Sequence, residues 1–157
     1  MKVLVTGGSG FLGLALCRAL VAQGHQVSSF QRSFSTELER LGVQQVLGAL
    51  HDRDKVLEAL QNQDAVIHNA AKASGWGSWN NFYQTNVLGT QNIIEGCLQL
   101  GIQKLVYTST PSVTHRGVQY MTVQGMLAAG YRDLLLDVGG FSPHRRFWGE
   151  WTELNLR

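Results

Sequence analysis

The sequence predicts an α/β protein built on a doubly wound parallel sheet, and three observations support this prediction. Short apolar runs alternate with segments of helical spacing over residues 1–112. The apolar runs are nearly continuous, which is typical of strands that helices cover on both faces. The unusual residues follow the ends of these runs, and right-handed crossovers bring those ends to the edge where such sheets bind ligands.

The first strand and the first helix have the clearest patterns. Residues 2–6, "KVLVT", form a β-branched run that ends in glycines and predicts a buried strand. Residues 10–24 predict a helix, because leucines recur there at helical spacing. Gly24 stands where a glycine in the left-handed conformation would end that helix.

The same alternation continues along the chain. Further strands are expected over residues 25–30, 43–50, 64–71 and 104–110. Further helices are expected over residues 35–42, 53–62 and 80–101. Thr36 and Glu39 have the spacing of a capping box, and Gly42 is the expected stop of the same helix. Asp52 is the expected N-cap of the next helix.

The alternation of apolar runs and helical segments weakens after residue 112. Residues 113–157 contain one apolar cluster, then glycines and a crowded aromatic and basic stretch, and they predict no confident sixth strand. We therefore expect an incomplete sheet of about five strands, followed by an atypical C-terminal segment. A sheet that ends early leaves one edge bare, so we also expect either self-association as a homo-oligomer or marginal stability.

Composition excludes several classes of function. A chain with 44% hydrophobic and 15% charged residues is typical of a soluble globular domain. The net charge of +2 is too small to indicate nucleic-acid binding. No apolar stretch approaches the roughly 20 residues of a membrane span, and no secretory signal is evident. We expect a cytoplasmic protein in which Cys17 and Cys97 are buried, reduced and small apolar side chains.

Three glycines connect the first strand to the first helix. Gly7, Gly10 and Gly13 have GxxGxxG spacing, which permits a tight turn, a close approach to a pyrophosphate and close helix packing. The helix N-terminus supplies free N–H groups and a partial positive charge for phosphates. In this context the motif predicts a Rossmann-like dinucleotide site. The alternative is a tight glycine-rich connection without a ligand.

The end of the second predicted strand bears on which dinucleotide binds. An acidic residue there would bind the ribose hydroxyls of NAD, whereas a nearby arginine suits the 2′-phosphate of NADP. The sequence "SSFQRS" has no acid and provides Arg32 and Ser33. We therefore predict NADP in preference to NAD. The alternative is that Arg32 is a solvated surface charge.

Four blocks in order resemble the extended short-chain dehydrogenase/reductases of the NAD-dependent epimerase/dehydratase superfamily. They are "TGGSGFLG" (6–13), "DAVIHNAA" (64–71), "NVLGTQNIIEGC" (86–97) and "KLVYTSTPSV" (104–113). Within that family the chain is similar to the 3β-hydroxysteroid dehydrogenase/isomerase branch. "AAKASGWGSW" and "YTSTPSVTH" are most similar to members that reduce long-chain 2-alkyl-3-oxoalkanoates. The resemblance makes residues 1–118 the NAD(P)-binding domain and 119–157 an atypical segment.

The resemblance implies where the cofactor lies along the first half of the chain. Phe11 and Leu12 would lie at the pyrophosphate together with the glycines. Ala49 and Leu50 occupy the segment that passes the adenine. The family often has an acidic residue where Ala49 stands, so this chain departs from the pattern there.

The resemblance also implies roles around the fourth predicted strand. Ala70, Ala71 and Lys72 would line the cofactor after that strand. Asn86 would be the helix asparagine that supports the active-site backbone. From its position inside the strand alone, His68 is predicted to be a hydrogen-bonded core histidine, and the alternative is a catalytic histidine. Trp76 and Trp79 would either cover an apolar substrate or anchor the start of the following helix.

The resemblance implies oxidoreductase chemistry on a ketone or a secondary alcohol of a bulky apolar substrate, steroid-like or long-chain 3-oxo. Hydride passes between the nicotinamide and the carbonyl carbon, and a tyrosine gives or takes the proton. A lysine four residues after that tyrosine lowers its pKa. Thr110 would be the hydroxyl that polarises the substrate oxygen, with Ser109 as its rival.

The tyrosine–lysine pair of that chemistry is missing from the sequence. Tyr120 is followed four residues later by Gln124, and the lysines are Lys2, Lys55, Lys72 and Lys104. We predict an impaired enzyme whose residues after about 118 reflect a truncation or a shifted reading frame. The alternatives are a short divergent domain, a non-catalytic NADP-binding module or redox sensor, and a poorly folded remnant. The histidine and cysteine spacing predicts no metal site.

Overall fold

The computed structural model describes residues 1–73, 76–109 and 127–130, the last of these as backbone only. The chain forms two compact units, Met1–Leu105 and Val106–Arg157, and each unit is described by itself. The domain boundary that the sequence predicts near residue 118 lies outside the described residues.

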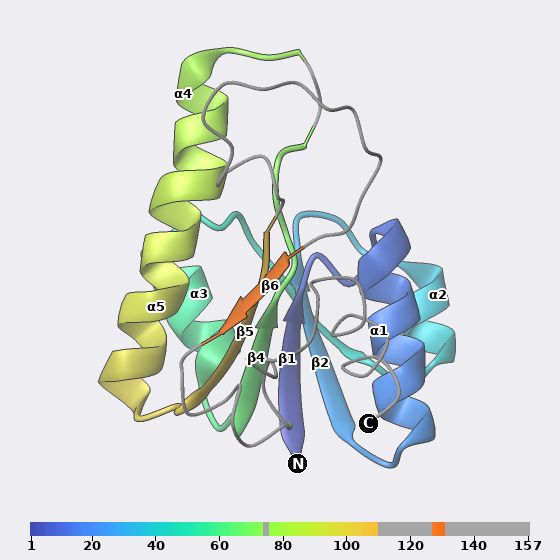
Figure 1. The fold of residues 1–157 in the computed structure, drawn as a ribbon. Helices are drawn as coiled ribbons and strands as arrows, with labels where there is room; N and C mark the ends of the chain where they lie inside the picture. The colour runs from blue at the N-terminus through green and yellow to red at the C-terminus, as the bar shows by residue number, and fades with distance from the viewer. Residues whose placement is uncertain (74–75, 110–126, 131–157) are drawn as a thin grey trace, which may run out of the picture. The chain divides into compact units, whose positions relative to one another are not determined.

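A parallel sheet forms the centre of the first unit (Figure 1). Its strand order is β3-β2-β1-β4-β5, and β5 enters this unit with its first two residues. The strands are β1 (Lys2–Thr6), β2 (Gln26–Gln31), β3 (Gln44–Leu47), β4 (Ala65–His68) and β5 (Lys104–Ser109). Val3 of β1 lies opposite Val27 of β2 and Ala65 of β4. The predicted parallel α/β sheet is confirmed.

Helices cover both faces of the sheet, as expected for a doubly wound fold. Figure 1 shows α1 (Phe11–Ala22) and α2 (Thr36–Arg40) on one side of the strands, and α3 (Arg53–Leu60) and α5 (Gly89–Leu100) on the other. Two apolar clusters match these two layers. The α3/α5 cluster includes Phe30, Val56 and Ile93, and the α1/α2 cluster includes Cys17, Val27 and Leu38. Successive residues of β1 pack into opposite clusters, because the side chains of a strand alternate between its faces. The β1 residue in the α3/α5 cluster is Leu4, and the one in the α1/α2 cluster is Val5.

Two buried cysteines belong to these clusters, one on each side of the sheet. Cys17 packs with the α1/α2 cluster and Cys97 with the α3/α5 cluster. Both thiols are free, which confirms the prediction from the sequence. Burial raises the pKa of each thiol to about 11, so both are protonated and unreactive near neutral pH.

Two strands are shorter than the sequence predicts, and hydrogen bonds to the Thr6 hydroxyl explain the difference for β4. The apolar run 64–71 continues past β4, but the strand stops at His68. The N–H groups of Asn69 and Ala70 donate to the Thr6 hydroxyl and not to a strand carbonyl. Residues 43–50 likewise yield a strand of four residues that ends at Leu47.

The helix predicted over residues 80–101 is continuous but not uniform. It comprises α4 (Trp79–Phe82), the π-helical segment η1 (Tyr83–Leu88) and α5. The Ser78 hydroxyl caps its start by accepting from the N–H of Asn81 at 3.4 Å. The predicted long helix is confirmed, and its wider central turn was not predicted, since apolar spacing does not reveal one extra residue in a turn.

The ends of the shorter helices test the predicted caps. The Asp52 carboxylate caps α3 by accepting from the N–H of Lys55 at 3.2 Å, as predicted. The capping box predicted at Thr36 and Glu39 is wrong, because Ser35 is the N-cap of α2. The Ser35 hydroxyl accepts from the N–H of Leu38 at 3.5 Å. The capping residue therefore lies one position before the one that the sequence pattern selected.

The second unit contains the remainder of β5 and a further strand, β6 (Leu127–Gly130). The two strands pair antiparallel, with Val106 opposite Gly130 and Ser109 opposite Leu127. The sequence predicted no strand after β5, because "LAAG" has none of the β-branched or aromatic residues that mark a strand. No helix in the described part of the chain is long and apolar enough to cross a membrane.

Candidate dinucleotide site

The glycine loop after β1 closes a tight turn that only glycine can form. Gly7 has a φ of +71°, in the left-handed region that favours glycine. Its N–H donates to the carbonyl of Phe30 at 2.8 Å, and its own carbonyl accepts from the N–H of Gly10 at 3.0 Å. A Cβ at Gly13 would collide with the Gly7 carbonyl oxygen and lie 2.8 Å from the Gly8 Cα. The loop and the first turn of α1 are therefore held in direct backbone contact.

The first turn of α1 presents backbone N–H groups without a side-chain cap. Gly10 is the N-cap, and no side chain accepts a hydrogen bond from the first turn. The first turn also contains no acidic residue. Phe11 is fully exposed and Leu12 is half-buried, so the start of α1 is accessible. An uncapped helix start with a glycine turn in front of it fits a phosphate or a pyrophosphate.

The end of β4 contacts this turn directly. A Cβ at Gly7 would lie 3.0 Å from the Cα of Ala70, so the two backbones are in close contact. The Thr6 hydroxyl oxygen accepts from the N–H groups of Asn69 at 3.1 Å and Ala70 at 3.0 Å. It also lies 2.8 Å from Nδ1 of His68. Thr6 therefore fixes the position of the segment that follows β4.

These contacts define the direction of a hydrogen-bond chain through His68. Because the Thr6 oxygen accepts two N–H groups, its own proton is directed to Nδ1 of His68. The ring proton then lies on Nε2, which donates to the Thr90 hydroxyl at 3.0 Å. Thr90 in turn donates to the carbonyl of Asn86 at 2.8 Å. Burial lowers the pKa of His68 to about 4, which keeps the ring neutral, and His68 is confirmed as a core histidine.

Asn86 links the π-helical segment to the chain after β4. Its Oδ1 accepts from the N–H of Lys72 at 2.7 Å, and its Nδ2 donates to the Lys72 carbonyl at 3.1 Å. This pair of bonds mimics one rung of a β-ladder. The turn that widens at η1 thus carries the residue that positions the Lys72 backbone.

An aromatic surface lies beside Lys72. The Lys72 ammonium is 5.2 Å from the centre of the Phe82 ring. Trp79 and Tyr83 have ring centres 6.4 Å apart, and Trp76 and Trp79 are 90% and 79% exposed. Neither indole is buried against the helix start, and an exposed aromatic surface of this kind can contact an apolar ligand.

The remaining predicted cofactor residues lie along β2 and after β3. Arg32 and Ser33 follow the end of β2 and are both exposed. Leu50 is buried in the core cluster, and its carbonyl accepts from Nδ2 of Asn92 at 2.9 Å. Ala49 is half-buried beside it, and Ala71 is exposed.

The predicted catalytic hydroxyls belong to the second unit. Ser109 is the last residue of β5. Thr110 lies outside the described residues, as do Tyr120 and the positions after it up to residue 126. No group of three or more metal-ligating side chains occurs among residues 1–73 and 76–109.

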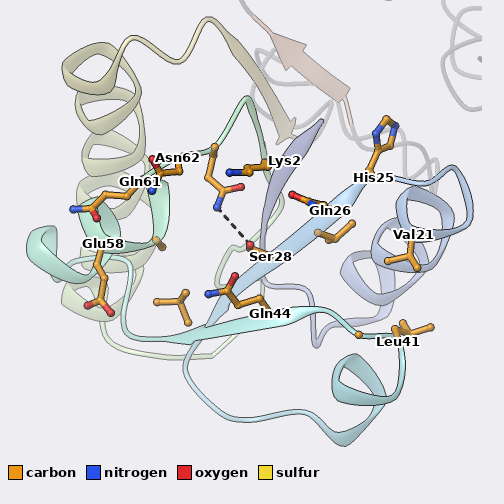
Figure 2. Close-up of a pocket in the computed structure, with 15 residues that line it drawn as sticks. Lys2, Val21, His25, Gln26, Ser28, Leu41, Gln44, Glu58, Gln61 and Asn62 are labelled. Atoms are coloured by element: carbon orange, nitrogen blue, oxygen red, sulfur yellow. Dashed lines mark hydrogen bonds between the residues drawn. The ribbon is translucent and has the colours of Figure 1, made fainter.

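A separate cavity of about 740 Å³ lies at the opposite ends of the strands (Figure 2). Lys2, Gln26 and Gln44, which begin β1, β2 and β3, line it. The amide Nε2 of Gln63 donates to the Ser28 hydroxyl at 3.4 Å on its wall. Doubly wound sheets bind ligands beyond the carboxyl ends of their strands, so this cavity is not the dinucleotide site.

The doubly wound sheet with its strand–glycine turn–helix element defines a Rossmann-like protein of the short-chain dehydrogenase/reductase type. The chain belongs to the 3-beta hydroxysteroid dehydrogenase/isomerase family, whose model matches residues 4–125. This confirms the resemblance noted in the sequence.

Two relatives illustrate the range of the family. The chain is 59% identical over 116 residues to the 2-alkyl-3-oxoalkanoate reductase of Stenotrophomonas maltophilia, covering 74% of this chain and 35% of that protein. It is 38% identical over 119 residues to the human sterol-4-alpha-carboxylate 3-dehydrogenase, decarboxylating, covering 74% of this chain and 31% of that protein. The chain thus spans about a third of the length of these relatives.

Solved structures agree with the fold. A UDP-glucose-4-epimerase from Stenotrophomonas maltophila with bound NAD and formylated UDP-arabinopyranose is 29% identical, with a TM-score of 0.67. The match covers 78% of this chain and 40% of that one. The enzyme WbmG of Bordetella bronchiseptica, in complex with NAD, is 25% identical with a TM-score of 0.66, covering 76% and 40% of the two chains.

Sequence reasoning missed three residues that organise this region. Thr6 and Thr90 contact His68, and Gln45 of β3 contacts Gln31 and Ser35, so all three act through side-chain contacts with segments distant in the sequence. The only signal in the sequence is a polar residue within an otherwise apolar strand, as at Thr6.

Proposed function

We propose that this chain is the NAD(P)-binding portion of a short-chain dehydrogenase/reductase-type oxidoreductase that interconverts a ketone and a secondary alcohol. The observation that supports it best is the glycine turn at Gly7, held against the uncapped first turn of α1. The two solved structures described above, which share this fold, contain NAD, and this supports a nicotinamide cofactor. The cofactor, when bound, supplies or accepts the hydride.

The chain's own residues bind and orient the cofactor. The loop at Gly7, Gly10 and Gly13 and the N–H groups of α1 hold the pyrophosphate. The Thr6–His68–Asn86 chain keeps the segment from Ala70 to Lys72 in place beside the loop. Arg32 and Ser33 at the end of β2 favour NADP, since a guanidinium can bind a phosphate with two parallel hydrogen bonds.

The substrate is a bulky apolar 3-oxo or 3-hydroxy compound, steroid-like or long-chain. The names of the relatives support this, because one acts on 2-alkyl-3-oxoalkanoates and another on sterol carboxylates at position 3. The exposed rings of Trp76, Trp79 and Tyr83 supply an apolar surface in the first unit. Thr110, or Ser109 in its place, polarises the substrate oxygen.

A second candidate is a non-catalytic NADP-binding module or redox sensor. The sequence favours it at one point, because the last lysine is Lys104 and no lysine follows Tyr120 or Tyr131 by four residues. An ammonium at that spacing would lower the pKa of a proton-donating tyrosine, and the sequence supplies none there. We therefore propose that turnover by this chain is impaired.

A binding titration tests the dinucleotide site. NADPH and NADH are each titrated against the protein, and the fluorescence of the reduced nicotinamide reports binding. Gly13→Ala is expected to abolish binding, because the new Cβ would collide with the Gly7 carbonyl. Gly42→Asn is the control, because that position has a φ of +71° and open space around it. If the wild-type chain binds neither dinucleotide, the proposed function is wrong.

A turnover assay separates the two candidates. The absorbance of NADPH is followed with a long-chain 3-oxo acid or a 3-oxosteroid as substrate. Oxidation indistinguishable from the protein-free rate supports impairment. Turnover that Thr110→Ala abolishes would contradict the impairment and support the enzyme.

A further inference from the structure

One side chain on β3 holds both ends of the segment that carries Arg32 and Ser33. Oε1 of Gln45 accepts from Nε2 of Gln31 at 2.8 Å, and Gln31 is the last residue of β2. The same oxygen accepts from the N–H of Ser35 at 2.8 Å. Nε2 of Gln45 donates to the carbonyl of Ser35 at 2.9 Å. The amide of Gln45 thus closes the three-residue segment 32–34 at both of its ends.

Gln31 itself is directed into the protein and away from the edge where a ribose would lie. It is 7% exposed. Its Oε1 accepts from the hydroxyl of Ser29, and its Nε2 is bonded to Gln45. In NAD-binding folds an acidic residue near this strand end binds the ribose hydroxyls. Here the side chain at the end of β2 is neutral and bonded within the sheet, so a 2′-phosphate would be met by the segment that follows.

That segment is exposed along its whole length. Arg32, Ser33 and Phe34 are all exposed, and Phe34 is 57% exposed. Neither Arg32 nor Ser33 forms a hydrogen bond or an ion pair with another described residue. Their backbone is therefore held at both ends while their donor groups remain available. An ordered loop with available donors binds a ligand at a smaller entropic cost than a loose one.

We propose that Gln45 is a positioning residue that sets the dinucleotide specificity of this chain by holding the segment 32–34 so that Arg32 and Ser33 meet the 2′-phosphate of NADP. The proposal rests on the proposed dinucleotide site and adds to it the residue on which the preference depends. NAD carries a hydroxyl at that position and no phosphate, so its affinity depends little on the order of this loop. Gln45 touches neither ligand and acts through the loop alone.

The variant Gln45→Leu tests the proposal, with Gln44→Leu as its matched control. Gln44 is the preceding residue of β3, is exposed and lines the cavity at the opposite ends of the strands, as Figure 2 shows. The dissociation constants of NADPH and NADH are measured for each variant. For Gln45→Leu we expect the NADPH affinity to fall about tenfold, as for the loss of one charge-assisted hydrogen bond, with NADH changed less than about twofold. Gln44→Leu should change neither.

A second variant and a smaller probe cover the case in which Gln45→Leu fails to fold. Gln45→Asn keeps the amide but shortens it by one methylene, so it cannot reach both Gln31 and Ser35. Adenosine 2′,5′-bisphosphate should then lose affinity, whereas adenosine 5′-monophosphate, which has no 2′-phosphate, should bind as before. This readout isolates the phosphate contact from the rest of the dinucleotide.

Every other outcome overturns the proposal in a recognisable way. Equal losses for NADPH and NADH would show that Gln45 only supports the fold. If the ratio of the NADPH and NADH affinities is the same in Gln45→Leu and the wild type, the segment 32–34 does not contact the 2′-phosphate. A wild-type chain that prefers NADH would leave the dinucleotide site in place and refute the specificity. A wild-type chain that binds neither would refute the proposed function and this inference together.

Discussion

Burial keeps His68 neutral by lowering its pKa, and two hydroxyl groups contact its ring. The Thr6 proton occupies the direction of Nδ1, and Nε2 donates to Thr90, so this arrangement uses one proton on the ring. A second proton would oppose the Thr6 hydroxyl and place a charge in a buried site. The histidine therefore joins β1, β4 and the long helix only in its neutral form.

The first prediction concerns the pH dependence of stability. The pKa of His68 is about 4 in the folded state, against 6.5 for the unperturbed group. Between these values the unfolded state binds more protons, so His68 makes the folded state less stable as the pH falls from 6.5 to 4. We expect His68→Gln to have a shallower loss of unfolding free energy over that interval, measured by urea denaturation.

The control for this prediction is His51→Gln, which alters an exposed histidine. Its stability should follow the wild-type pH dependence. Carboxylates also titrate in this interval, so the informative quantity is the difference in slope between each variant and the wild type. Equal slopes for His68→Gln and the wild type would refute the neutral-histidine account.

At the scale of elements, local patterns predicted the helices and strands better than their ends. The leucine spacing of α1 and the β-branched run of β1 are local and strong. The end of β4 depends on the Thr6 hydroxyl, a contact across 63 residues that no local pattern contains. The segment η1 likewise contains a contact that no local pattern includes, because the Asn86 side chain accepts from the N–H of Lys72. Polar contacts between segments therefore set the boundaries that sequence patterns missed.

The second prediction concerns two glycines of α5, because alanine at each would place its Cβ against a different kind of atom. A Cβ at Gly89 would lie 2.5 Å from Cβ of Leu50, which is fixed to the backbone. A Cβ at Gly96 would instead meet Cδ1 of Leu60, the outer atom of a buried side chain, which can shift more easily than a Cβ. Alanine gains about 1 kcal/mol of helix propensity over glycine, whereas overpacking costs about 1–3 kcal/mol. Gly89→Ala should therefore be destabilising and Gly96→Ala close to neutral.

Chemical denaturation of the two variants measures this difference. The double variant Gly89→Ala with Leu50→Ala supplies a further check. It removes Cγ and Cδ1 of Leu50, which leaves space for the remaining Cβ to move away from the new methyl group. We expect a favourable coupling between the two substitutions. If Gly96→Ala is the more destabilising of the two, the contact of Gly89 with Leu50 does not limit the packing of α5 on the core.

At the scale of the whole molecule, the sequence predicted the fold class and the glycine loop because both depend on short-range patterns. It could not predict the contacts of Gln45, whose side chain bonds the Gln31 side chain 14 residues away and the Ser35 backbone 10 residues away. It also missed β6, whose four residues "LAAG" have no strand signature. Part of β5 pairs with β6, so less of the strand edge is bare than the sequence implied. Self-association remains a prediction, which sedimentation velocity can test.

The last prediction concerns the coupling of cofactor binding to unfolding. A ligand that binds only the folded chain stabilises it by about 2.7 kcal/mol at a free concentration one hundred times its dissociation constant. We therefore expect NADPH to raise the thermal midpoint by several degrees, measured by circular dichroism during heating. Gly13→Ala should show no shift at the same concentration, because its glycine turn is disrupted. A midpoint that rises equally in both proteins would mean that NADPH stabilises the chain from outside the glycine loop, since a shift through this site requires the turn at Gly7 to be intact.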